Sequence, residues 1–345
     1  MKRILFVSST RIGDAVLSTG LIWHLAEQYP DCRITVACGP LSAPLFAALP
    51  NVARVIEIKK RRYSLHWLDL WAKCVFTWWY LVVDLRGSGL AWVLATLHRR
   101  IFRGNRRDSF FRRLIRGTHK GTHRHRVEEI SDVLNLKEPC APRLQASTEA
   151  QSRAASLIPS SASTSEIILA IAPVATWRGK QWRIENFVEL VRRLTGEGGL
   201  FQGARVAVLG AANERDQALP VIEAVPEARR IDLVGAVDLP TLYSCLERCS
   251  FYIGNDSGLT HMAAAAGIPT LGLFGPTDER HYAPWGDNAA VVRTALSLKE
   301  LVGFPEFDWN RTETLMDSLT IDAVLAAVED LQARQGSNVT PVTTY

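Results

Sequence analysis

Residues 254–276 read Gly-Asn-Asp-Ser-Gly-Leu-Thr-His-Met-Ala-Ala-Ala-Ala-Gly-Ile-Pro-Thr-Leu-Gly-Leu-Phe-Gly-Pro, and they decide the fold class of the chain. The apolar run 251–253 just before them predicts a buried strand that stops at the Gly-Asn pair. Asp256 or Ser257 then stands where a helix N-cap is expected, and Gly258 lets the backbone come close to a ligand. Because the first N–H groups of a helix have no partner within it, this turn could bind a phosphate.

The alanine-rich run after the turn predicts a helix that packs closely on a sheet and ends near Ala266. Gly267 and Pro269 end this helix, and residues 270–274 predict the next buried strand. An ordinary, well-capped strand–turn–helix has the same pattern. The stretch therefore indicates α/β structure, and a ligand needs support from elsewhere in the chain.

The same alternation of strands and helices runs through the whole sequence, which predicts parallel sheets covered by helices. A Ser-rich stretch at 156–165 interrupts it, so we predict a linker there between an N-terminal domain, 1–155, and a C-terminal domain, 166–334. The tail 335–345 is predicted to be disordered. Strands are expected at 3–8, 33–37, 55–58, 80–85, 167–172, 206–209, 250–253 and 270–274, and helices at 14–29, 41–48, 184–194, 218–225, 239–248 and 321–334.

Two doubly wound domains of similar size, both Rossmann-like, are the predicted fold class. In such domains ligands bind beyond the C-terminal ends of the strands, so the expected active site is a cleft between the two. A length of 345 residues and a hydrophobic content of 47% are enough for two cores.

Composition also bears on the compartment. The six cysteines are scattered without a Cys-x-x-Cys pair, which favours reduced thiols over disulfides or a zinc site. The most hydrophobic window, 75–97, holds Asp84 and Arg86 at its centre and is not a credible membrane span. We expect a cytoplasmic protein, with peripheral attachment to the inner face of the cytoplasmic membrane as a further option.

Positive charge is concentrated in one segment. Residues 98–126 contain eleven Lys or Arg and one acid, Asp108, a net charge of +10 in a chain whose total is +5. Such a segment is either a solvated loop or a binding surface for an anion, and the interleaved phenylalanines favour the surface. The arginines taken as candidate acceptor contacts are Arg106, Arg107, Arg112 and Arg113.

A second basic cluster, 59–62, precedes four tryptophans within thirteen residues, at 67, 71, 78 and 79. These tryptophans could belong to the core. They could also seat the protein at a membrane interface, where the ring is partly in lipid and partly hydrated. The sequence leaves both possibilities open.

Two positions stand where catalytic or phosphate-binding groups are expected. Asp14 follows the first strand, where a carboxylate could accept a proton from a sugar hydroxyl, or could simply be a cap or first-turn acid. Lys180 lies after the strand 167–172 and, with Thr176 and Arg178, supplies two cations and a hydroxyl that could hold a diphosphate without metal. A loop lysine of this kind is also often only solvated.

The turn at 255–265 resembles the donor-site motif of the glycosyltransferase family that contains the ADP-heptose:lipopolysaccharide heptosyltransferases. The likeness extends in order and spacing along most of residues 1–290. The other matching segments are 4–17 with its Gly-Asp turn at Asp14, 83–87 (Val-Asp-Leu-Arg-Gly), 125–128 (His-Arg-Val-Glu), 179–182 (Gly-Lys-Gln-Trp) and 274–277 (Phe-Gly-Pro-Thr).

The resemblance implies a GT-B fold and roles for particular residues. Family members place the presumed general base at the Gly-Asp position, here Asp14, and a phosphate-contacting lysine at the position of Lys180. This chain has Ala175 where the family often has a second threonine, which removes one possible hydrogen bond. The donor-binding set implied in this way is Thr176, Lys180, Glu214, Asp256, Ser257, Gly258 and His261, although a helical histidine such as His261 is more often structural.

The expected activity is an inverting, metal-independent transfer of heptose from ADP-heptose to the lipopolysaccharide inner core. The partners are then a nucleotide-diphosphate sugar and an anionic glycolipid at the membrane surface, with no nucleic acid, no cofactor and an open oligomeric state. The absence of Asp-x-Asp, Gly-x-Gly-x-x-Gly and P-loop patterns agrees with this expectation. Two alternatives remain: a family member with another nucleotide-sugar or acceptor, and a non-catalytic module that binds anions on a membrane or nucleic acid.

Overall fold

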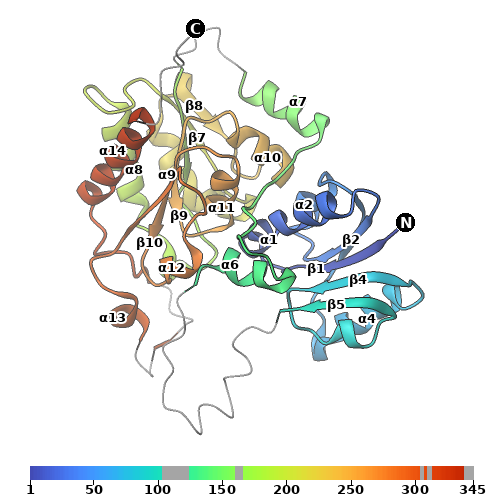
Figure 1. Ribbon diagram of the computed structural model, residues 1–345. Helices are drawn as coiled ribbons and strands as arrows, with labels where there is room; N and C mark the ends of the chain where they lie inside the picture. Colours follow the sequence, from blue (N-terminus) through green and yellow to red (C-terminus); the bar gives the residue numbers. More distant parts are fainter. Residues whose placement is uncertain (103–123, 160–165, 304–306, 309–312, 338–345) are drawn as a thin grey trace. The chain divides into compact units, whose positions relative to one another are not determined.

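The computed structural model describes residues 1–102, 124–159, 166–303, 307–308 and 313–337. These residues form two compact units, Met1–Ala146 and Ser147–Tyr345 (Figure 1). Each unit is an α/β domain built on its own parallel sheet.

The first unit has a five-stranded parallel sheet in the order β3-β2-β1-β4-β5. The chain runs outward from β1 through β2 to β3 and then returns to the other side of β1 with β4. The strand order therefore reverses between β1 and β4, where doubly wound sheets bind their ligands. The strands are β1 Arg3–Val7, β2 Arg33–Cys38, β3 Val52–Glu57, β4 Trp79–Asp84 and β5 Thr96–Ile101.

Alternating side chains of β1 serve two separate cores. Ile4 and Phe6 pack on one face of the sheet with apolar residues of α2, α3 and α6. Leu5 and Val7 pack on the other face with α4 and the short turn Leu90–Trp92. Both faces are thus covered, as a buried parallel strand requires. The helices of this unit are α1 Ile12–Leu17, α2 Thr19–Gln28, α3 Ala43–Ala47, α4 His66–Cys74 and α6 Arg126–Ser131.

The second unit has a six-stranded parallel sheet in the order β11-β10-β9-β6-β7-β8. Its strand order reverses between β6 and β9, which pair directly along Leu169 to Ala172. The carboxyl ends of β6 and β9 therefore lie side by side at the switch point. The strands are β6 Ile168–Ala172, β7 Arg205–Val208, β8 Arg230–Asp232, β9 Phe251–Asn255, β10 Thr270–Phe274 and β11 Ala289–Arg293.

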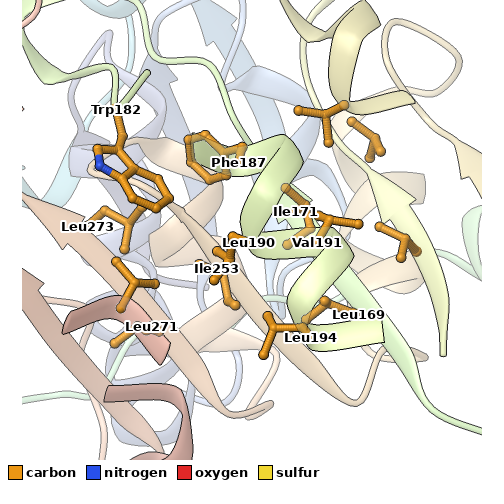
Figure 2. Packing of buried hydrophobic residues seen from close by; sticks show 14 of the residues in the cluster. Leu169, Ile171, Trp182, Phe187, Leu190, Val191, Leu194, Ile253, Leu271 and Leu273 are labelled. Atoms are coloured by element: carbon orange, nitrogen blue, oxygen red, sulfur yellow. The ribbon is translucent and has the colours of Figure 1, made fainter. Parts of the chain in front are cut away.

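The core of the second unit is formed by one face of this sheet and the helices that cover it (Figure 2). The indole of Trp182 is buried against the ring of Phe187, with centroids 5.1 Å apart. Its Nε1 donates to the carbonyl of Leu319 at 2.8 Å, which satisfies the polar atom. The helices of this unit are α7 Thr148–Leu157, α8 Ile184–Thr195, α9 Arg215–Ala224, α10 Leu239–Leu246, α11 Gly258–Ala265, α12 Glu279–Tyr282, α13 Leu298–Val302 and α14 Ile321–Ser337.

The predicted fold class is confirmed, while three edge strands, β5, β8 and β11, were not predicted and several boundaries need correction. The helix expected at 14–29 is two helices, because the chain turns at Ser18 between α1 and α2. The division between the units falls after Ala146 and not at 155, since α7 packs against α10 of the second unit. The first two residues of the expected linker, 156–165, are the end of α7, and the beginning of the expected tail, 335–337, is the end of α14. Residues 160–165 and 338–345 lie outside the described part. The arrangement of the two domains across a cleft stays a prediction.

The cysteines are all free thiols, and five of the six are buried. Burial raises the pKa of Cys38 to about 12, so its sulfur behaves as a small apolar group. Within the described residues, no helix combines the length and the apolar character needed to cross a bilayer.

Candidate active site

The loop after β6 and the turn after β9 meet at the switch point of the second sheet. Lys180 Nζ lies 2.6 Å from Asp256 Oδ2, and Thr277 Oγ1 donates to the same oxygen at 2.8 Å. The carboxylate is the more buried partner, with side-chain exposures of 6% for Asp256 and 25% for Lys180. The structure therefore brings together Lys180 and Asp256, which the sequence placed in one site, and adds Thr277.

Asn255 at the end of β9 ties these loops together. Its Oδ1 accepts from the backbone N–H of Trp182 at 3.0 Å, and its Nδ2 donates to the carbonyl of Pro173 at 2.7 Å. The side chain is fully buried, so both bonds are shielded from water. Asn255 was not selected from the sequence as a site residue, although it lies beside Asp256 in the motif.

The turn also positions the N-terminus of α11. Ser257 is the N-cap residue, in an extended conformation, and its side chain makes no capping hydrogen bond. Gly258 is the first residue of the helix. The first backbone N–H groups of α11 therefore belong to the same turn as Asp256, the partner of Lys180. A helix N-terminus beside a cation favours the binding of a phosphate. The ammonium group of Lys180 is already paired with the carboxylate of Asp256.

Three other predicted donor residues have different surroundings. Thr176 is exposed on the loop after β6. Glu214 Oε2 accepts from the backbone N–H of Ala211 at 2.8 Å, so this side chain caps its own turn after β7. His261 is buried in α11, with 4% of its surface exposed. Contact of these three residues with a donor remains a prediction.

Asp14 lies at the switch point of the first sheet. The N-cap of α1 is Arg11, so Asp14 is a first-turn acid and not the cap. Ser9 Oγ donates to Asp14 Oδ2 at 3.4 Å, and the Nε of Arg126 lies 3.9 Å from Oδ1. These contacts are long, and the side chain keeps 17% of its surface exposed, so the carboxylate can still accept another donor.

Arg126 is a neighbour of Asp14 that sequence reasoning did not single out. It is the first residue of α6, where His125 Nδ1 accepts from the backbone N–H of Val127 at 3.2 Å. Its guanidinium lies 4.4 Å from the centroid of the Phe102 ring and pairs with Glu129 at 3.3 Å, and both contacts hold the side chain beside Asp14. The sequence signals were its position within the segment His-Arg-Val-Glu and its place at the end of the basic segment 98–126.

Arg86 joins the loop after β4 to the turn after β1. It follows β4, and its Nη1 donates to Thr10 Oγ1 at 3.3 Å. The loop that carries it is fixed by Asp84, whose carboxylate accepts from the backbone N–H groups of Arg86 and Ser88. The candidate acceptor contacts Arg106, Arg107, Arg112 and Arg113 lie outside the described residues.

Comparison with known families and proteins gives this geometry a context. The sequence model of "Glycosyltransferase family 9 (heptosyltransferase)" matches residues 81–303, well over half of the chain. The match includes the loop of Lys180, the turn of Asp256 and the segment of Arg126, and it begins after Asp14.

Curated relatives span most of the chain at low identity. A lipooligosaccharide heptosyltransferase 2 of Haemophilus influenzae is 25% identical over 324 residues, covering 84% of this chain and 88% of the relative. A lipopolysaccharide heptosyltransferase 2 of Salmonella typhimurium is 25% identical over 315 residues, with the same two coverages of 84% and 88%.

Solved structures share the fold over nearly the whole chain. The ADP-heptose lps heptosyltransferase II of Escherichia coli gives a TM-score of 0.71 at 22% identity, covering 97% of this chain and 100% of that one. A family 9 glycosyl transferase of Veillonella parvula gives 0.75 at 20% identity, covering 96% and 97%. These likenesses confirm the fold and leave the substrates to other arguments.

Proposed function

The chain belongs to glycosyltransferase family 9, and from this premise we propose that it transfers heptose from ADP-heptose to the inner core of lipopolysaccharide. It is a glycosyltransferase, which decides against the non-catalytic anion-binding module. The observation that carries the finer proposal is the cluster of Lys180, Asp256 and Thr277 beside the N-terminus of α11. This cluster is suited to a diphosphate, and the relatives are heptosyltransferases by name.

The donor diphosphate would lie against Lys180, Thr176 and the first N–H groups of α11. A cation and fixed N–H dipoles stabilise the negative charge that grows on the leaving group as the sugar bond breaks. Asp256, to which Thr277 donates, would hold the ammonium group of Lys180 in place before the donor arrives. No step in this arrangement needs a metal ion, and metal independence is part of the proposal.

Asp14 would act as the general base. Its carboxylate takes the proton of the acceptor hydroxyl, and the oxygen then attacks the anomeric carbon from the face opposite the diphosphate. The C–O bond to the acceptor forms as the bond to the diphosphate breaks, so a single displacement inverts the anomeric configuration. Arg126, whose Nε lies 3.9 Å from Oδ1, would help to orient the carboxylate of Asp14.

The acceptor would be bound through its phosphates and acidic sugars by the basic segment 98–126. This part of the proposal rests on the net charge of +10 in the sequence. It assigns acceptor contacts to Arg106, Arg107, Arg112 and Arg113.

The test is a transfer assay with the purified chain, a heptose-deficient lipopolysaccharide and a panel of nucleotide-sugars. Of the nucleotide-sugars in the panel, we expect only ADP-heptose to raise the unfolding temperature of the chain. A ligand at one hundred times its Kd adds about 2.7 kcal/mol to the free energy of unfolding. Transfer should follow, with inversion visible in the anomeric proton couplings of the product. Stabilisation by a different nucleotide-sugar, with transfer of that sugar, would replace ADP-heptose by another donor of the same family.

A further inference from the structure

Several large apolar side chains on and around α4 of the first unit are exposed. Phe76 is 98% exposed, Trp78 67% and Trp92 65%. Isolated apolar residues on a surface are normal, but a group of this size marks an interaction site. We call this surface the α4 face; its apolar members are Leu65, Leu68, Trp71, Phe76, Trp78, Trp92 and Val93.

These side chains come from neighbouring elements. Leu68 and Trp71 are exposed on α4, while Leu70 and Cys74 of the same helix are buried against the sheet. The Nε1 of Trp71 donates to the carbonyl of Val93 at 3.2 Å, which joins α4 to the turn Leu90–Trp92. The helix is therefore apolar on the side that meets the sheet, and its exposed surface combines the apolar Leu68 and Trp71 with the charged Asp69 and Lys73. A helix that only covers a core has a polar outer side.

Cations border the α4 face. A hollow of about 430 Å³ lies between β3 and α4, with Ile56, Ile58 and Leu70 among its walls. Segment 54–73 contains six Lys or Arg and two acids, a net charge of +4. Arg61 pairs with Asp69 at 2.8 Å and Lys59 with Glu57 at 3.6 Å. Both acids of the segment are therefore paired, and the segment has four cations more than it has acids. Four of the six, Arg54, Lys59, Arg61 and Lys73, line the hollow.

We propose that the α4 face binds an anionic phospholipid bilayer, with α4 lying in the plane of the interface. Exposed tryptophans and leucines would enter the boundary between headgroups and acyl chains, where indole rings are favoured. The cations of segment 54–73 would contact lipid phosphates, which also attract basic segments electrostatically. Positive charge beside the apolar surface favours this occupant over a second copy of the chain, whose own cations would face the same cations across a symmetric contact.

The first turn of α4 lies close to the edge of the sheet that carries Asp14, whereas Phe76 and Trp78 directly precede β4 and lie toward the opposite, amino edge. Arg86 donates to Thr10 in the turn after β1, and its guanidinium lies 5.9 Å from the centroid of the Trp67 ring in α4. One side chain thus spans the turn after β1 and the first turn of α4. The membrane proposal goes beyond the proposed function and does not depend on which sugar is transferred.

The experiment measures co-sedimentation of the full chain with vesicles of phosphatidylcholine, with and without phosphatidylglycerol. The apolar variant is Phe76→Ser with Trp78→Ser, and the charge variant is Lys60→Glu with Arg62→Glu. All four side chains are exposed, so both variants should fold, and thermal unfolding checks this. Matched controls in the second unit are Leu200→Ser with Leu296→Ser for the apolar change, and Lys299→Glu for the charge change.

We expect the wild type and both controls to bind the anionic vesicles and to bind neutral ones weakly. Each α4-face variant should bind at least about tenfold more weakly, and the deficit of the charge variant should shrink at high salt. Indole fluorescence should shift to the blue on binding in the wild type. Transfer to a detergent-dispersed acceptor should be unchanged in both variants.

Three results would overturn this inference. If both variants still bind vesicles as the wild type does, another part of the chain is responsible for the binding. Binding to neutral and anionic vesicles alike would remove the role of the cations. The wild type could instead bind no vesicles and form a dimer in sedimentation velocity, while the apolar variant is a monomer. This result would assign the α4 face to contact with a second copy of the chain. If vesicle binding behaves as expected while no heptose is transferred, the proposed function fails and the membrane face stands.

Discussion

The turn of Asp256 in the second unit and the turn of Asp14 in the first unit follow central strands of two similar sheets, but they are built differently. Asp256 accepts at 2.6 Å and 2.8 Å and is almost fully buried. Asp14 has contacts at 3.4 Å and 3.9 Å and is more exposed. Both carboxylates lie at the switch point of their sheet, Asp14 after the first strand of its unit and Asp256 after the fourth, and they differ in their freedom to react.

This difference indicates two kinds of work. Asp256 is committed to Lys180 and Thr277, and the loop beneath them is fixed by the buried Asn255, so the turn is organised before a ligand binds. Preorganised groups stabilise charge without rearranging during the reaction. Asp14 keeps accessible surface, as a base must if it is to reach a substrate proton.

The largest expected effect follows from replacing Asp14. Asp14→Asn keeps the size of the side chain and removes its ability to take a proton. Turnover should fall by about 10²–10⁴-fold, while donor affinity stays within about twofold of wild type. Single-turnover transfer and donor titration measure the two quantities. A variant that keeps more than about a tenth of wild-type turnover would show that Asp14 is not the base.

Lys180→Ala should give the next largest effect. Loss of the cation should lower kcat/KM by about 10²–10³-fold and weaken ADP binding, because the leaving diphosphate loses a charge-assisted contact. Asp256→Asn is the matched variant, since it frees Lys180 without removing it, and it should cost less. Steady-state kinetics of both variants test the order. Equal activity of Lys180→Ala and wild type would contradict the assignment of the phosphate site.

Asn255→Ala should affect stability first. It leaves the backbone N–H of Trp182 and the carbonyl of Pro173 without their buried partner, at a cost of about 1–3 kcal/mol. Ser9→Ala, which removes only a 3.4 Å contact to Asp14, should change the free energy of unfolding by less than about 0.5 kcal/mol. Chemical denaturation compares them. Similar losses in the free energy of unfolding for the two variants would show that the turn of Asp256 is not held more rigidly than the turn of Asp14.

Charge reversal at Arg106, Arg107, Arg112 and Arg113 should raise the acceptor KM severalfold and leave donor affinity unchanged. Exposed cations attract phosphates over about a Debye length, roughly 8 Å at physiological salt, so the effect should fade at high ionic strength. Acceptor kinetics at low and high salt provide the test. If the KM is already the same at low salt, the segment is a solvated loop and the acceptor is bound elsewhere.

The smallest expected effect is that of a chelator. If Lys180 and the N-terminus of α11 replace a metal at the diphosphate, EDTA should leave kcat and donor affinity of the wild type unchanged. The measurement is the transfer rate before and after dialysis against EDTA. A loss of activity that magnesium or manganese restores would show that the clamp is incomplete without a metal.

The sequence by itself determined the α/β class, because alternating apolar strands and amphipathic helices leave few other ways to bury the chain. The family resemblance of its motifs placed Lys180 and the Asp256 turn in one site, and this agrees with the rule that strand ends meet at one edge of a parallel sheet. Its errors were missed elements, among them the edge strands β5, β8 and β11, and misplaced boundaries. Ser18 breaks a helix that has continuous apolar periodicity, and α7 joins the second unit through packing that local composition does not encode.

Only the tertiary structure decided which partners each polar group has. Thr277 follows a different strand from Lys180, yet it donates to the same carboxylate, because β10 lies next to β9 in the sheet. Arg126 reaches Asp14 across 112 positions of the chain by packing on Phe102. The tryptophans of residues 67–79 were ambiguous in the sequence, and the structure buries Trp79 while it exposes Trp78. Pairings and exposure of this kind depend on how distant elements pack, and that information is spread over the whole chain.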